Sequence, residues 1–167
     1  SAEAIPTSED RLFELAWRLL FENDTLKLQA VAKQMHVSPS TLTQDLEKLD
    51  RWFEEYHLEV ERKKGVGARV LGYESEKRKL LINALLAHWD TLAFYRFVRG
   101  EDDYIPAFLK MVPCEEMLEG LRDGYDYLKS LSFERMDDRT IMRVTFAYGV
   151  QQERLASGFF LEMYTKG

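Results

Sequence analysis

The sequence predicts a mainly α-helical chain in which one β-hairpin separates two groups of helices. Two observations carry this prediction. Apolar residues recur at helical spacing through most of the chain, and the pattern changes period only between residues 58 and 72, around a pair of glycines. We therefore expect residues 1–74 to form a domain of three helices and a hairpin, and residues 75–167 to form an all-helical second domain.

The composition is that of a globular protein, with 46% hydrophobic and 31% charged residues among 167. The single cysteine, Cys114, excludes a disulfide within the chain and a zinc site built from cysteines. The apolar run at residues 80–87 is too short to span a membrane. The abrupt start at residues 1–4, and a helical pattern that stops abruptly at residues 166–167, indicate a piece of a longer protein. We expect a cytoplasmic protein with no membrane partner.

The first two helices are predicted at residues 8–22 and 26–35. Ser8 is placed to cap the first helix, and acidic residues follow it in the first turn, where they favour the helix dipole. Leu12, Leu15 and Leu19 recur at helical spacing. The second helix is shorter and carries its apolar residues on one face.

The third helix is predicted from Ser38 to about Tyr56. Ser38 is a favourable N-cap and Pro39 a favourable first helical residue. The expected buried stripe of this helix consists of Leu42, Leu46, Leu49, Phe53 and, less regularly, Trp52. The polar residues near its start include serine, threonine and glutamine, which leaves that end free of bulky apolar groups.

A β-hairpin is predicted between residues 58 and 72. Gly65 and Gly67 flank its turn, because glycine accepts the positive φ that a tight hairpin requires. Basic residues approach the tip from both strands. The period-2 pattern ends at Tyr73, where helical spacing returns.

The second half is predicted to be helical throughout. Ser75 is placed to cap a helix over residues 76–89, and further helices are expected near 91–99, 104–111, 114–131 and 137–157. Residues 100–103 and Pro113 mark breaks between them. No strand is expected in this half.

The order of helix, short helix, turn, long helix and basic hairpin is that of a winged helix-turn-helix domain. The leading end of its third helix projects spare N–H groups and partial positive charge towards phosphate. Gln44 has the donor and acceptor pair that reads an adenine edge in the major groove. Basic hairpin residues would meet flanking phosphates or the minor groove. The candidate DNA-binding residues are Ser38, Ser40, Thr41, Thr43, Gln44, Lys48, Arg62, Lys63, Lys64 and Arg69.

Two segments resemble the Mga-like and MtlR/LicR-type transcription regulators. Residues 28–49, LQAVAKQMHVSPSTLTQDLEKL, are similar to their helix-turn-helix, and residues 56–72, YHLEVERKKGVGARVLG, to their wing. The resemblance implies a DNA-binding regulator of sugar-uptake genes, similar in layout to the BglG-type antiterminators. Family members often carry an arginine where this chain has Gln44, and often have two helix-turn-helix units in tandem.

A weaker resemblance extends into the second half. Residues 128–133 and 141–158 look like part of a phosphotransferase-system regulation domain, which implies sugar phosphotransferase proteins as partners. In that family a histidine precedes the arginine-containing helix end and is phosphorylated. Here Ala147 stands seven residues before Arg154, and none of the three histidines falls in the motif.

Catalytic and metal chemistry have no support in the sequence. His36, His57 and His88 show no metal-ligand spacing, and paired carboxylates such as Asp137 and Asp138 suit helix starts better than acid–base catalysis. We expect no enzyme activity and no cofactor. The net charge of −6 keeps a second hypothesis open, in which the chain is a protein-interaction module and another domain binds DNA. A homodimer is expected, and the helical second half would either dimerise the chain or receive a signal.

Overall fold

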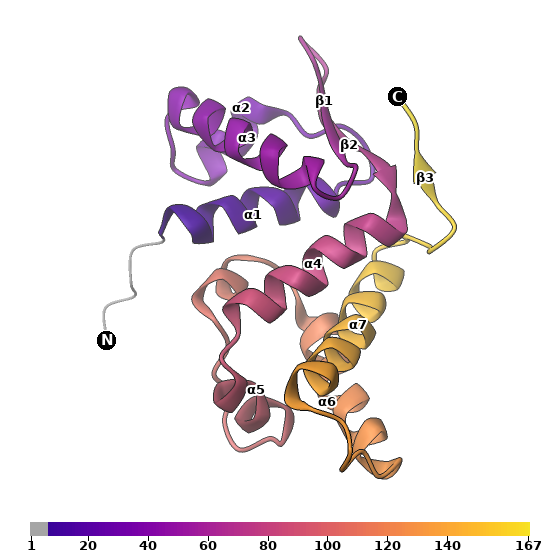
Figure 1. Cartoon of the computed structure of the whole chain (residues 1–167). Helices are drawn as coiled ribbons and strands as arrows, with labels where there is room; N and C mark the ends of the chain where they lie inside the picture. Colours follow the sequence, from indigo (N-terminus) through magenta and orange to yellow (C-terminus); the bar gives the residue numbers. More distant parts are fainter. Residues whose placement is uncertain (1–6) are drawn as a thin grey trace. The chain divides into compact units, whose positions relative to one another are not determined.

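The computed structural model describes residues 7–167 and divides the chain into two compact units (Figure 1). The first unit contains the chain up to Lys77 together with Glu162–Gly167, and the second is Arg78–Leu161. The boundary that the sequence placed after residue 74 therefore falls within the first turn of a helix, and the last six residues group with the first unit. The predicted cut near residues 1–4 lies outside the described residues.

Three helices form most of the first unit, as predicted: α1 (Ser8–Leu20), α2 (Leu28–Gln34) and α3 (Pro39–Glu54). The cap of α1 differs from the prediction by one residue. Thr7 is the N-cap: its Oγ1 accepts a hydrogen bond from the Asp10 amide at 3.1 Å, and its own amide donates to Asp10 Oδ2 at 3.0 Å. This reciprocal capping box satisfies two backbone donors, so Ser8 becomes the first helical residue.

The start of α3 is as predicted. Ser38 is its N-cap, with Oγ accepting from the Thr41 amide at 3.1 Å, and Pro39 is its first residue. His36 in the preceding turn has φ 57°, a left-handed conformation that reverses the chain between α2 and α3. Four apolar residues of α3, at positions 42, 46, 49 and 53, are buried as expected, while Trp52 is half-buried.

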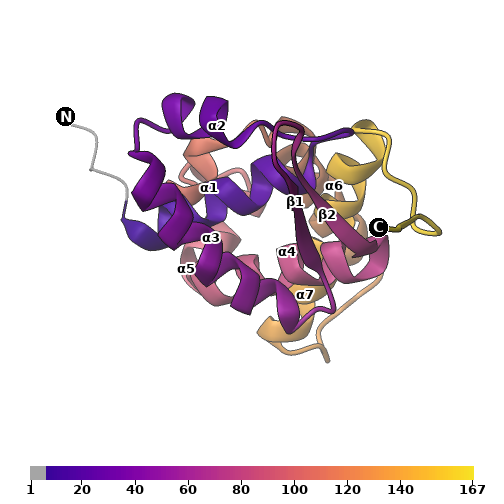
Figure 2. The ribbon, with the colours of Figure 1, turned by 90° about the horizontal axis from the view of Figure 1, so that it is seen from above.

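The predicted hairpin is present as β1 (Glu59–Lys63) and β2 (Gly67–Tyr73), paired antiparallel with Val60 opposite Val70. A third segment joins its other edge. Leu26, in the connection between α1 and α2, exchanges two backbone hydrogen bonds with Ala68, at 2.7 and 2.8 Å. Figure 2 shows this connection passing beside the hairpin. The tip of the hairpin is thereby fixed to the helices.

The expectation that the second half contains no strand is wrong. Tyr164–Thr165 forms β3, which pairs antiparallel with the end of β2, so the sheet order is β1-β2-β3. The strand is two residues long and has no alternating pattern. It is stabilised by pairing with an existing sheet edge, which no local sequence pattern reports.

The second unit is built from the rest of α4 (Glu74–His88), then α5 (Thr91–Val98), the 3₁₀ helix η1 (Ala107–Met111), α6 (Glu115–Ser130) and α7 (Asp138–Ala156). These match the predicted helices apart from their ends. Ser75 lies inside the first turn of α4 and does not cap it, because the helix follows β2 directly. The segment predicted to be helical from residue 104 becomes a 3₁₀ helix from Ala107.

Small residues bring α6 and α7 close together. A Cβ added to Gly149 would lie 2.9 Å from the carbonyl oxygen of Met117, and one added to Gly120 would lie 3.1 Å from the Gly149 Cα. An aromatic cluster fills the interior of this unit, with Trp89, Phe94 and Phe146 in mutual contact. The second unit therefore has a core of its own.

Candidate nucleic-acid interface

The leading end of α3 carries a compact group of hydroxyls. Ser38 Oγ lies 3.1 Å from Ser40 Oγ and donates to Thr41 Oγ1 at 3.0 Å, while Thr43 Oγ1 donates to the carbonyl oxygen of Pro39 at 2.9 Å. Ser38, Ser40 and Thr43 are exposed and Thr41 is half-buried. Small side chains allow a ligand to approach the helix end closely, so this end presents hydrogen-bonding groups at short range.

One exposed face of α3 continues from this end at helical spacing. Gln44 and Lys48 lie on it, as the sequence indicated, and neither has a side-chain hydrogen bond to any residue from 7 to 167. Sequence reasoning missed Glu47 and Arg51, which are exposed on the same face. The i, i+3 and i+4 spacing from Ser40 and Gln44 was the signal that could have identified them.

The opposite face of α3 is anchored to α1 by an ion pair. Arg11 Nε and Nη2 donate to the two carboxylate oxygens of Asp45 at 2.7 and 3.1 Å. Asp45 is buried, and the hydrogen bond to its carboxylate raises the pKa of Arg11. A two-point contact of this kind restricts rotation of α3 about its own axis, so the exposed face is held in one orientation.

The four predicted basic residues of the hairpin lie in different environments. Arg62 Nη2 donates to both oxygens of Asp50 at 3.0 and 2.8 Å. Arg69 Nε donates to Glu61 at 2.9 Å, and this hydrogen bond lowers the pKa of that carboxyl group. The Lys63 Nζ lies 3.7 Å from the same carboxylate. Three of the four cations are therefore partly neutralised within the protein.

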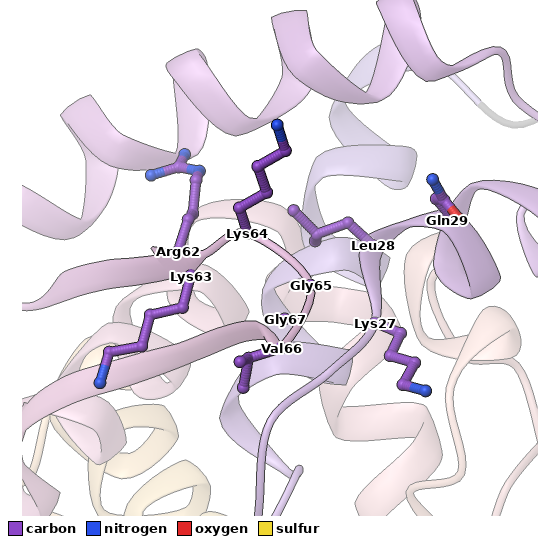
Figure 3. Close-up of a pocket in the computed structure, with 9 residues that line it drawn as sticks. All are labelled: Lys27, Leu28, Gln29, Arg62, Lys63, Lys64, Gly65, Val66 and Gly67. Carbon is purple, nitrogen blue, oxygen red and sulfur yellow. The ribbon is translucent and has the colours of Figure 1, made fainter.

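Lys64, at the turn of the hairpin, is different. It is exposed, and it forms no ion pair with any residue of the described part of the chain. Figure 3 shows Arg62 and Lys64 extending on one side of the hairpin and Lys63 on the other, as strand alternation requires. Lys64 is thus the hairpin cation whose charge is most available to a ligand.

An open groove of about 380 Å³ separates the hairpin tip from the beginning of α2 (Figure 3). It is lined by Lys27, Leu28, Gln29, Arg62, Lys63, Lys64, Gly65, Val66 and Gly67. Sequence reasoning did not include Lys27, since its position beside the hairpin depends on the pairing of Leu26 with Ala68. No acidic side chain belongs to this lining.

Together, the three helices, the hairpin and the strand segment at Leu26 define a winged helix-turn-helix domain. The uncovered face of α3 and the adjoining hairpin form its candidate nucleic-acid interface. Residues 9–84 match the family model described as the Mga helix-turn-helix domain. That match spans α1 to α3, the hairpin and most of α4, so this part of the chain is similar to a Mga helix-turn-helix domain. Among curated protein sequences, none matches the chain.

The remaining chemistry-bearing residues have structural surroundings. Within residues 7–167, no group of histidine, cysteine, aspartate and glutamate side chains is placed to hold a metal ion. Burial raises the pKa of the Cys114 thiol to about 12, and its Sγ faces the carbonyl oxygen of Leu109 at 3.6 Å. No helix in the described part of the chain is long and apolar enough to cross a membrane. Domain families of the helix-turn-helix class are generally not enzymes.

Proposed function

We propose that this chain reads DNA sequence for a transcription regulator, with α3 in the major groove and the hairpin on the flanking backbone. The observation that carries the proposal is the uncovered polar face of α3, held in one orientation by the pair of Arg11 with Asp45. Gln44 is suited to bidentate hydrogen bonding with an adenine edge, and the Thr43 methyl to contact with a thymine methyl. Ser38, Ser40, Thr41 and Lys48 then contact phosphates and sugars, with Arg62, Lys63, Lys64 and Arg69 on the wing.

Selection of duplexes from a randomised pool tests this proposal. The full chain is expected to enrich a defined sequence, and Thr43→Ala and Gln44→Ala are each expected to relax the preference at one or two positions. A good base contact is worth about 1–3 kcal/mol of discrimination. Gln151→Ala, an exposed glutamine of α7, is the matched control. Enrichment that is identical in wild type and both α3 variants would remove α3 from the proposed role.

Control of carbohydrate-uptake genes is a further part of the proposal. It is supported by the resemblance of residues 128–133 and 141–158 to a phosphotransferase-system regulation domain, with sugar phosphotransferase proteins as partners. Ala147 is half-buried in α7, where that family carries its histidine. We therefore propose a second unit that senses its signal without phosphorylation at this position. Incubation with phosphorylated phosphotransferase carrier proteins, followed by intact-mass measurement, should show no added phosphate.

Self-association is the alternative role that a specific observation favours. On α7, Val144, Tyr148 and Leu155 are exposed by 44, 41 and 39% and follow one another at spacings of four and seven residues. Part of the Tyr148 ring also lies against Gly124 of α6. Such a stripe is typical of helix–helix packing. If the chain is only an interaction module, it will sediment as a dimer and will not bind duplex DNA even at low salt. If the chain is a dimer that binds duplex DNA, and Tyr148→Glu dissociates that dimer, the result supports both DNA binding and self-association.

A further inference from the structure

We infer that the groove between the hairpin tip and the start of α2 holds the sugar–phosphate backbone of a nucleic-acid strand, with Lys27 and Lys64 on its two sides. This inference rests on the proposed function and deepens it. It adds a contact between the nucleic-acid backbone and Lys27, a residue outside both α3 and the hairpin. It also assigns a role to the apolar floor of the groove between the two lysines.

The charge of the groove is of one sign. Its basic residues are Lys27, Arg62, Lys63 and Lys64, and its lining contains no carboxylate. Arg62 and Lys63 are partly neutralised by Asp50 and Glu61, as described above. Lys27 and Lys64 are exposed and have no ion pair among residues 7–167. The two available positive charges therefore come from separate elements and approach the groove from opposite sides.

The floor of the groove is apolar. Leu28 points toward the hairpin tip, and Val66, at the turn, is 48% exposed (Figure 3). A Cβ added at Gly65 would meet no atom within 4 Å, so nothing obstructs the groove at the turn. An exposed apolar strip between two cations matches a strand in which an apolar deoxyribose ring separates consecutive phosphates. A single inorganic phosphate would leave that strip uncovered.

The two sides of the groove are held together by backbone contacts. Leu26 and Ala68 exchange hydrogen bonds at 2.7 and 2.8 Å, and Thr25 Oγ1 donates to the carbonyl oxygen of Val66 at 3.4 Å. A Cβ on Gly67 would lie 2.7 Å from the carbonyl oxygen of Leu26, so only glycine permits this approach. The groove is thus formed before any ligand binds, which lowers the ordering cost of binding.

The salt dependence of duplex binding tests the inference. Duplex DNA is titrated with the full chain at several salt concentrations. The slope of the logarithm of the binding constant against the logarithm of the salt concentration reports how many phosphates the protein neutralises. Lys27→Gln and Lys64→Gln are each expected to make this slope shallower by about one unit without changing sequence preference. Lys33→Gln, at the other end of α2, and Lys110→Gln, in the second unit, are same-charge controls and are expected to change it less.

Amide chemical shifts distinguish a backbone strand from a free anion. Duplex DNA is expected to shift the amides of Leu28, Gly65 and Val66, whereas inorganic phosphate at the same ionic strength is expected to leave them in place. If inorganic phosphate shifts these three amide signals along a binding curve that saturates, the inference is overturned. An unchanged salt slope in both lysine variants of a chain that still selects its sequence would also overturn it. In that case the sequence-reading role proposed for α3 would stand, without a phosphate contact from Lys64. A chain that binds no duplex at low salt would overturn both.

Discussion

Tyr73 and Tyr164 are cross-strand partners, with ring centroids 4.4 Å apart, although the whole second unit lies between them in the sequence. The chain leaves the sheet after Tyr73 and enters α4, and it returns through Met163, whose carbonyl oxygen accepts a hydrogen bond from the Glu74 amide at 3.0 Å. The second unit is therefore an insertion between two paired residues at the base of the wing. The chain enters and leaves the second unit through residues of the first unit.

Replacement of Tyr164 by alanine should weaken the base of the wing. An aromatic pair contributes about 0.5–1.5 kcal/mol beyond its buried area, so we expect a loss of about 1 kcal/mol in the local opening free energy of β2. Hydrogen exchange at the amides of Gly72 and Tyr73 measures this opening. Tyr127→Ala, at an exposed tyrosine of α6, should leave those amides unchanged. Equal protection in Tyr164→Ala and wild type would show that the ring pair contributes nothing.

Removal of Arg11, the ion-pair partner of Asp45, should destabilise the first unit. The Asp45 side chain is 2% exposed and would remain as a buried, unpaired carboxylate in Arg11→Met. Loss of one partner of a buried pair costs about 3–5 kcal/mol, and we expect the lower end, since Arg11 itself is 25% exposed. Urea unfolding measures the change. The double variant Arg11→Met/Asp45→Leu should recover most of it, and a double variant as unstable as the single one would contradict the assignment to an unpaired charge.

Asp50→Asn should strengthen duplex binding. The carboxylate holds the Arg62 guanidinium in a two-point ion pair, whose side chains are 42 and 37% exposed. Exposed pairs contribute at most about 1 kcal/mol to folding, so stability should change little. The released arginine becomes available to phosphate, and the salt slope should steepen by about one unit. Glu54→Gln removes the same charge from an exposed residue at the end of α3, and a steepening of equal size there would point to net charge alone.

Cys114 should be unreactive in the folded chain at pH 8. Its pKa is raised to about 12, mainly by burial, so the thiolate forms only as the pH approaches that value. At pH 8 about one molecule in ten thousand would carry the thiolate. A chromogenic disulfide reagent should therefore react only as urea unfolds the second unit, with the same midpoint as loss of helical circular dichroism. Rapid, stoichiometric reaction under native conditions would show that the thiol is accessible.

Local signals in the sequence predicted α3 well, because the start of this helix is set by residues close to it in the sequence. Ser38 and Pro39 fix it through a cap and a restricted φ, and both act within four residues. The start of α1 was misplaced by one residue, since Thr7 and Ser8 are both competent caps and only Thr7 forms the reciprocal contact with Asp10. Choosing between adjacent caps depends on side-chain geometry that composition does not report.

Local sequence signals could not predict pairings between residues far apart in the chain. The strand at Tyr164 is stabilised by β2, and the position of Lys27 depends on the bridge from Leu26 to Ala68. The sequence placed basic residues at the hairpin correctly, but it did not show that Arg62 is held by Asp50. Which cations remain available to a ligand depends on these pairings, and they are visible only once the chain is folded.

The adjacency of Tyr73 and Tyr164 also makes the two units separable by engineering. Paired strands lie about 4.8 Å apart, a gap that a short turn can close. A loop of a few residues from Tyr73 to Tyr164 would replace residues 74–163, which include the whole second unit, and leave the sheet β1-β2-β3 complete. The same two attachment points would accept a different inserted domain, so the base of this hairpin is a position at which an unrelated unit can be grafted without interrupting β1 or β2.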